Sequence, residues 1–362
     1  MNTIIYNKKN IDIIYWYLIT KIISITLLII FLPIVFQKNY FYSNDFYNLY
    51  ILCDFRSPNY LFSIITCFLK IKNLTDIQAL LLSGILSFLK DFMFLIVASN
   101  FLKKNYLIFF SFLLAAHPYL NLYYLKFTPD LINNLMISFF FYLIMTKKNI
   151  NSGINIIFIL GSMMRNSLVP FFISYYVINI YKKIFVEKKF IKNKFIILDD
   201  LIFIIILWLS LFIVKSDYAS GFLSSNKNYD LNLNFFLNQI NSGLLFFDYF
   251  LSIILNFISH LILLMGFREQ AFTQFLDFFS YNNDFIIFYL VFGIFLFFFH
   301  FVGLLYIFKK FIKSNIYIIL FLIFILPHIF LVTHLRYYMP LMPVSILGVC
   351  LLTQSFFHKK KN

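Results

Sequence analysis

The chain has 362 residues, of which 62% are hydrophobic and only 12% are charged, whereas soluble domains carry about 25% charged residues. This composition excludes water-soluble enzymes, zinc fingers and coiled coils, because long apolar runs recur from end to end and leave no room for a soluble domain. It predicts an all-α, polytopic integral membrane protein whose residues 1–362 form a single transmembrane domain.

The net charge of +15 does not indicate a nucleic acid partner, because the lysines stand in short clusters between apolar runs. Such clusters mark the cytoplasmic side of a membrane protein. Both termini are therefore expected in the cytoplasm, and the expected location is the cell membrane, most simply a bacterial inner membrane. The clusters are Lys8 and Lys9, Lys103 and Lys104, Lys147 and Lys148, the lysines of 182–194, Lys309, Lys310 and Lys313, and Lys359 to Lys361.

The apolar runs predict about ten or eleven transmembrane helices. Three runs lie between Lys194 and Lys309, and an odd number cannot return the chain to the same side, so we expect 244–265 to be re-entrant or interfacial. The two short runs between Lys148 and Lys182 are expected to form a shallow hairpin. In chain order the runs are 13–36, 77–101, 106–122, 130–145, 154–164, 168–181, 198–214, 244–265, 285–308, 316–332 and 338–356.

Three segments fall on the outer side of this topology: 37–76, the short 121–129, and 215–284. The first mixes aromatic and polar residues at helical spacing without a spanning length, which predicts amphipathic helices at the interface. Ten of the fifteen acidic residues lie in or beside outer segments: Asp45, Asp54, Asp76, Asp130, Asp217, Asp230, Asp248, Glu269, Asp277 and Asp284.

The four arginines also lie at outer segments or span ends: Arg56, Arg165, Arg268 and Arg336. A guanidinium offers a planar fork for phosphate or carboxylate, which an ammonium does not. Arginines gathered on one face therefore suggest an anionic ligand there. The alternative is that they pair with nearby acids or lipid headgroups.

Asp45, in the first outer segment, has two interpretations. As a carboxylate near the bilayer surface it is a candidate general base for a hydroxyl acceptor. Ser43, Asn44 and Asp45 are also good N-caps for a following helix. Near the other end of the chain, His334, Arg336 and Tyr337 stand at a membrane boundary, where we favour a function, although a boundary arginine can also snorkel to headgroups.

Two further features lie inside predicted spans. Lys90 and Asp91 are mid-span charges, which would suit a transporter, and we favour instead an ion pair across to another helix. His117 is expected to be a polar helix-end residue and not a ligand, because no second histidine stands at metal-binding spacing. No metal site is predicted.

Several elements together resemble the GT-C superfamily of polytopic glycosyltransferases, which includes protein mannosyltransferases and the lipid A aminoarabinose transferase. They are the acidic first outer loop, His117-Pro118-Tyr119 before the Pro129-Asp130 helix start, the Gly161-x-x-x-Arg165-Asn166 turn, and the final Arg336-Tyr337-x-x-Pro340-x-x-Pro343.

The resemblance implies a catalytic aspartate at Asp45, with Asp54 as the second candidate. It also implies a lipid-phosphate donor near Arg336 and Tyr337, with Arg56, Arg165 and His334 as further substrate-binding candidates. The implied donor is a polyprenyl-phosphate sugar, the acceptor is a lipid, glycan or protein, and no cofactor is implied. The other classes that remain open are an O-antigen polymerase or ligase and a transporter or flippase.

Overall fold

The protein is all-α in the computed structural model. The structure describes residues 8–36, 76–117, 120–121, 129–146, 152–164, 168–187, 197–213, 247–248, 251, 254, 284–320 and 339–359, and within them it contains helices and no strand. Its elements are α1 (Lys8–Phe36), α4 (Asp76–Ser99), α5 (Lys104–Ala116), α7 (Pro129–Met145), α8 (Ser152–Met164), α9 (Leu168–Tyr181), η2 (Lys182–Val186), α11 (Leu198–Ile213), α16 (Asp284–Phe311), η5 (Ile316–Ile318) and α19 (Leu341–Lys359).

These helices coincide with the apolar runs of the sequence. The run predicted over 168–181 is α9 with the same bounds, and the run predicted over 130–145 is α7, one residue longer at its start. α5 ends at Ala116, earlier than the predicted 122, because the chain turns at His117 before Pro118. The predicted segment 244–265 lies almost wholly outside the described residues, so its re-entrant path stays a prediction.

Within the described residues, one helical stretch, Leu81–Ser99, is both long and apolar enough to cross a bilayer. Shorter apolar helices accompany it at Lys104–Ala116, Leu131–Met145, Gly153–Met164 and Leu341–Phe357.

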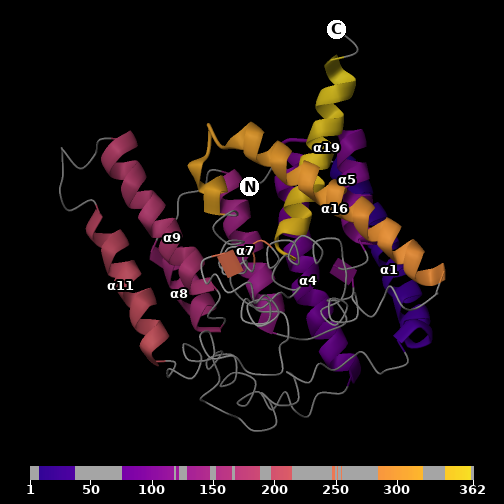
Figure 1. Ribbon diagram of the computed structural model, residues 1–362, viewed down its shortest axis with the longest axis horizontal. Helices are drawn as coiled ribbons and strands as arrows, with labels where there is room; N and C mark the ends of the chain where they lie inside the picture. The colour runs from indigo at the N-terminus through magenta and orange to yellow at the C-terminus, as the bar shows by residue number, and fades with distance from the viewer. Residues whose placement is uncertain are drawn as a thin grey trace.

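The helices form two groups that meet at α7 (Figure 1). In the larger group α1 packs on α5, α16 on α19, and α4 on α7, while α19 also contacts α4 and α5. The smaller group holds α8, α9 and α11, and α8 joins it to α7. A second joint is η5, where the Asn315 side chain donates to the Ile144 carbonyl at 3.4 Å and the Tyr317 hydroxyl donates to Asn179 Oδ1 at 2.8 Å.

The lysine-bearing ends of the larger group gather on one side. Lys104 at the start of α5 lies 3.3 Å from Asp12 in the first turns of α1. The Gln354 side chain, near the end of α19, donates to the Phe101 carbonyl and accepts from the Lys103 amide. The Phe101 ring also meets the Phe311 ring at the end of α16, with the centroids 5.2 Å apart. Helix ends that the sequence assigns to one side of a membrane are thus neighbours in the fold.

α16 and α19 approach each other through two glycines. A Cβ built on Gly303 would lie under 3.0 Å from the Ser345 carbonyl, and one on Gly348 would lie under 3.0 Å from the Gly303 carbonyl. Neither position therefore tolerates a side chain at this helix separation. His300 and Ser345 each precede one of these glycines by a single turn, so the close crossing brings the two side chains together.

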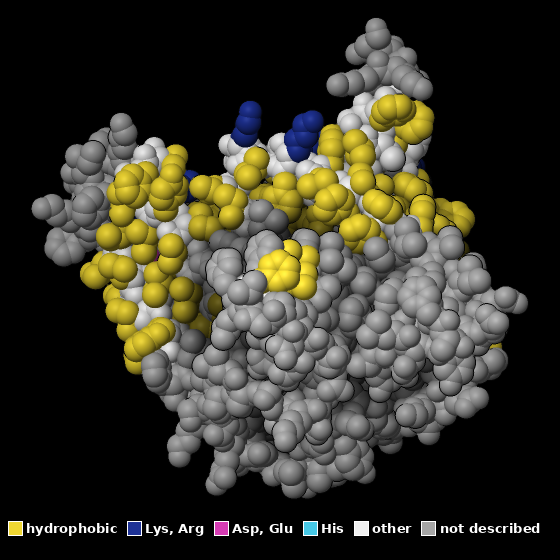
Figure 2. Space-filling view, viewed as in Figure 1, with side chains coloured by type: hydrophobic (Ala, Val, Ile, Leu, Met, Phe, Trp, Pro, Cys, Tyr) yellow, Lys and Arg dark blue, Asp and Glu magenta, His cyan; other side chains and the backbone are white. Residues whose placement is uncertain are grey.

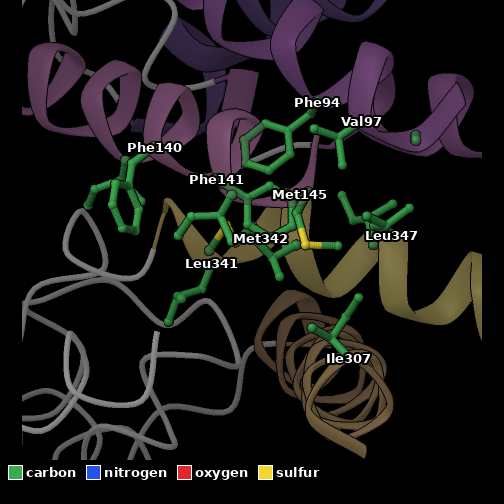
Figure 3. Close-up of a cluster of buried hydrophobic side chains, with 14 of the residues drawn as sticks. Phe94, Val97, Phe140, Phe141, Met145, Ile307, Leu341, Met342 and Leu347 are labelled. Atoms are coloured by element: carbon green, nitrogen blue, oxygen red, sulfur yellow. The ribbon is translucent and has the colours of Figure 1, made fainter. Parts of the chain in front are cut away.

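Apolar side chains fill the bundle near the lysine-bearing ends of α4, α7 and α16, where they pack against α19. Figure 3 shows side chains from four helices gathered together: Phe94 and Val97 from α4, Phe141 and Met145 from α7, Ile307 from α16, and Leu341, Met342 and Leu347 from α19. Phe140 of α7 points instead toward the smaller helix group, where its ring meets those of Phe158 and Phe172. Most of the gathered side chains are under 5% exposed, and the Phe94 and Phe141 rings lie 5.4 Å apart. We refer to the eight residues of this cluster, without Phe140, as the apolar layer.

Candidate functional site

The residues that the sequence singled out for catalysis and substrate binding lie outside the described part of the chain. They are Asp45, Asp54, Arg56, Arg165, His334, Arg336 and Tyr337. The structure does describe helix ends that flank them: α1 ends and α4 begins on either side of the first outer segment, α8 ends just before Arg165, and α19 begins after Arg336. Each of these four helix ends is the end that lies away from the lysine cluster of its helix.

The described residues hold a different polar centre, buried in the larger helix group. Its carboxylate is Asp91 on α4, fully buried, which accepts a hydrogen bond from the Tyr17 hydroxyl at 2.6 Å. Lys21 on α1 lies 3.3 Å from Asp91 Oδ2, and Lys90 lies 3.3 Å from Oδ1. The expected ion pair from Asp91 across to another helix is therefore confirmed, and the partner is Lys21.

This charged group lies well inside the bundle. Along the helix axes, Lys21 is roughly 20 Å from Lys8, and Asp91 is roughly 12 Å from Ser99. Lys21 and Lys90 are each about 5% exposed. Burying an ion costs several kcal/mol unless it is paired and hydrogen-bonded. The Asp91 carboxylate offsets this cost for both lysines, which repel each other and are each held by their attraction to it. The three charges fasten the middle of α1 to the middle of α4.

A second part of the centre is a chain of hydrogen bonds through two histidines. His117, at the C-terminal end of α5, accepts from the Leu120 amide at its Nδ1, 3.3 Å away. Its Nε2 lies 3.0 Å from Nε2 of His300 on α16. His300 Nδ1 in turn bonds Ser345 Oγ, and the Ser345 hydroxyl donates to the Met342 carbonyl at 2.7 Å.

These contacts assign the histidine tautomers. Because His117 Nδ1 accepts an amide hydrogen, its proton sits on Nε2, which donates to His300 Nε2. His300 then carries its proton on Nδ1 and donates it to Ser345. The arrangement suits two neutral imidazoles and opposes a metal ion, because a metal bridging the two Nε2 atoms would need the His117 proton on Nδ1, against the Leu120 N–H. Among the described residues no group of three or more metal-ligating side chains gathers.

The charged group and the histidine chain are one centre. Lys21 and Lys90 both act electrostatically on His117, so the two parts lie within a few side-chain lengths of each other. Five helical segments meet there: α1, α4, the end of α5, α16 and α19. The sequence flagged Lys90, Asp91 and His117, but it missed Lys21, His300 and Ser345. Each of the three missed residues is a polar residue within a long apolar run, and this was the signal in the sequence that could have identified them.

On the side away from the lysines, the interior of α4 and α7 is polar. Ser83 and Ser87 precede Asp91 on α4 by about two turns and one turn, and both are buried. On α7, which packs against α4, Asn133 and Asn134 are buried near the start of the helix. Within the described part of the chain, the Oδ1 atom of Asn134 has no hydrogen-bond partner, and neither has Oδ1 of the buried Asn121 beyond α5. Buried amide oxygens of this kind call for a water or a ligand hydroxyl.

The smaller helix group has its own polar network at its lysine-bearing end. Asp200, in the first turn of α11, accepts from Lys183 Nζ at 2.6 Å and from Asn179 Nδ2 at 2.8 Å. Asn179 Oδ1 in turn accepts from Tyr317. This network ties α9, η2, α11 and η5 together, and we interpret it as structural.

Comparison of the chain with protein-family models, with curated proteins and with solved structures gives no match. What the fold defines by itself is an all-α helix bundle with a buried charged centre and lysine-bearing ends on one side.

Proposed function

We propose that this chain is a polytopic membrane glycosyltransferase. It moves a sugar from a polyprenyl-phosphate donor to a lipid, glycan or protein acceptor at the outer face of the cell membrane. The observation that carries the proposal is the division of the helix bundle: polar side chains line the half of α4 and α7 toward the outer segments, and the apolar layer closes the other half toward the lysines.

The bilayer placement is supported by the outer surface of the helices. Large apolar side chains cover α1, α11 and α16, and many of them are about half exposed. Those of α11 and α16 are visible in Figure 2. On α11 the exposed residues are Leu198, Leu201, Ile202, Ile205, Ile206, Trp208 and Leu209. Water disfavours an apolar surface of this extent, whereas lipid tails do not.

The side chains inside the helix bundle support a site on the outer side of the membrane. A lipid-linked donor in the outer leaflet reaches the enzyme from the side of the arginines and acids. On that side the bundle offers serine hydroxyls and asparagine amides, which suit sugar hydroxyls. Two of the amide oxygens, on Asn121 and Asn134, lack a partner among the residues that the structure describes. Toward the cytoplasm the apolar layer prevents water and solutes from passing.

In the proposed reaction, Asp45 takes the proton from the acceptor hydroxyl. The hydroxyl oxygen forms a bond to the anomeric carbon while the bond from that carbon to the phosphate oxygen breaks, with inversion. The leaving group is the polyprenyl phosphate anion. Arg336, with Arg56 and Arg165 as further candidates, stabilises its developing charge by electrostatic preorganisation.

The test is turnover of polyprenyl-phosphate hexoses by the purified protein in nanodiscs, with release of polyprenyl phosphate followed by mass spectrometry. Asp45→Asn keeps the shape of the side chain and loses the base, so we expect turnover to fall by ~100-fold or more. The matched control is Asp199→Asn, which makes the same change at an exposed acid at the lysine-bearing start of α11. Near-normal turnover in Asp45→Asn would move the base elsewhere, with Asp54 as the next candidate.

A transporter is the second candidate, favoured by the buried charges of Lys21, Lys90 and Asp91 in the middle of the bundle. The two functions separate on Asp91→Asn. A transporter that couples movement to this carboxylate loses transport with its fold intact, whereas a glycosyltransferase that uses Asp91 as an anchor loses stability first and retains turnover in the fraction that stays folded.

A further inference from the structure

The lysine-bearing side carries a dense cationic surface assembled from distant segments. We name Lys103, Lys104, Lys309, Lys310 and Lys313 the lysine patch; all five are exposed. Figure 2 shows cationic side chains projecting from this end of the bundle.

Tertiary contacts hold the patch together. The Phe101 and Phe311 rings lie just below the two lysine groups, one at the end of α4 and one at the end of α16, with the centroids 5.2 Å apart. Gln354 of α19 holds the turn between α4 and α5 from both sides, through the Phe101 carbonyl and the Lys103 amide. The lysines are therefore presented by a fixed scaffold and not by a loose tail.

The charges of the patch are weakly compensated. Among the described residues one carboxylate, Asp12, pairs with it, at 3.3 Å from Lys104 and with both side chains about half exposed. Exposed pairs of this kind contribute little. Lys310 Nζ lies 5.8 Å from the centroid of the Tyr306 ring and 5.7 Å from that of Phe311, so this ammonium group has aromatic neighbours within cation–π range and keeps its full charge.

The chemistry around the patch indicates the ligand. Ile312, between the patch lysines of α16, is 39% exposed, and Phe356, just after Gln354, is 57% exposed. A soluble polyanion gains nothing from apolar side chains beside the lysines. An anionic phospholipid satisfies both, with its phosphate on the lysines and its acyl chains on the apolar side chains.

We propose that the lysine patch binds the headgroup of an anionic phospholipid of the cytoplasmic leaflet. The inference rests on the bilayer placement proposed above and is independent of sugar transfer. Basic surfaces at the cytoplasmic ends of transmembrane helices gain affinity for anionic headgroups from each added lysine.

The experiment measures phosphatidylglycerol binding to the purified full-length protein by native mass spectrometry and by exchange in nanodiscs. Each lysine is worth roughly fivefold in affinity for anionic lipid, so Lys309→Gln/Lys310→Gln/Lys313→Gln should weaken phosphatidylglycerol binding by tens of fold or more. Phosphatidylcholine binding should not change. The matched control is Lys188→Gln/Lys189→Gln/Lys192→Gln, which removes the same charge from another cluster on the same predicted side.

Three results would overturn the inference. The first is an equal loss of phosphatidylglycerol affinity in both triple variants, which would indicate a general charge effect. The second is no loss of affinity in the Lys309/Lys310/Lys313 variant. The third is displacement of the bound lipid by tripolyphosphate in preference to phosphatidylglycerol, which would indicate a soluble polyanion as the ligand. Failure of sugar transfer with phosphatidylglycerol binding intact would count against the proposed enzyme alone. Failure of the protein to enter nanodiscs would remove the bilayer placement and this inference with it.

Discussion

The buried ion pair between Lys21 and Asp91 should contribute far more to stability than an exposed pair of the same length. At 3.3 Å and an effective dielectric constant of about 20, the attraction is about 5 kcal/mol. Desolvation of the two ions offsets much of it, which leaves a coupling of about 1–3 kcal/mol. Removing Asp91 alone should cost more, about 3–5 kcal/mol, because two lysines then stay buried without that carboxylate.

The assay is a double-mutant cycle of Lys21→Met and Asp91→Leu, with the free energy of unfolding measured by steric trapping in bicelles. The fold supplies a matched control in Lys104 and Asp12, whose N···O distance is also 3.3 Å but whose side chains are 48% and 57% exposed. A cycle at this pair should give about 0.2–1 kcal/mol. Equal coupling energies at the two pairs would refute the argument that burial makes the Asp91 pair strong.

Three further predictions concern the helix crossing, the donor site and the topology. Gly348→Ala should destabilise the protein by about 1–3 kcal/mol, because the added Cβ would meet a carbonyl of α16. The control is Gly84→Ala, which has nothing within 4 Å of its Cβ and should be neutral or stabilising. Equal unfolding free energies for the two variants would contradict the close crossing. Arg336→Lys should impair binding of the lipid-phosphate donor more than the control Arg268→Lys, and unchanged donor affinity and turnover would remove Arg336 from the site. Reporter fusions should place both termini in the cytoplasm, and an external C-terminus would restore 244–265 as a full span.

The helix boundaries were predictable from the sequence because lysine pairs, Pro129 and the polar turns interrupt the apolar runs. What the runs could not show is where a helix continues past such an interruption. The chain stays helical beyond Tyr181 as the π-helix η2, although Lys182 and Lys183 read as a cytoplasmic stop. The carboxylate of Asp200 lies within reach of Lys183, so the charge that signals the end of a span is neutralised by another helix.

The buried centre was only half predictable, because its parts come from runs with no common spacing. Lys90 and Asp91 are adjacent and stand out at once, and an ion pair to another helix follows from the cost of burying them. Which helix supplies the partner depends on the packing of α1 against the rest of the bundle. His117 and His300 are 183 residues apart in the sequence, about half of the chain, and no spacing rule connects them. Gly303 and Gly348 let α16 and α19 approach closely and so bring Ser345 to His300, whereas His117 arrives from α5, which packs on α19.

In the bilayer placement proposed above, the histidine chain would lie within the field of the membrane potential. Each elementary charge that crosses 100 mV releases about 2.3 kcal/mol. Two adjacent imidazoles in the middle of a bilayer would therefore dissipate the membrane potential if they could transfer protons from one side to the other. Here both ends of the chain are backbone groups: the Leu120 amide occupies the first ring nitrogen, and the last donor, Ser345, ends on the Met342 carbonyl. Neither group takes up or releases a proton. The two rings can therefore join three helices without opening a leak.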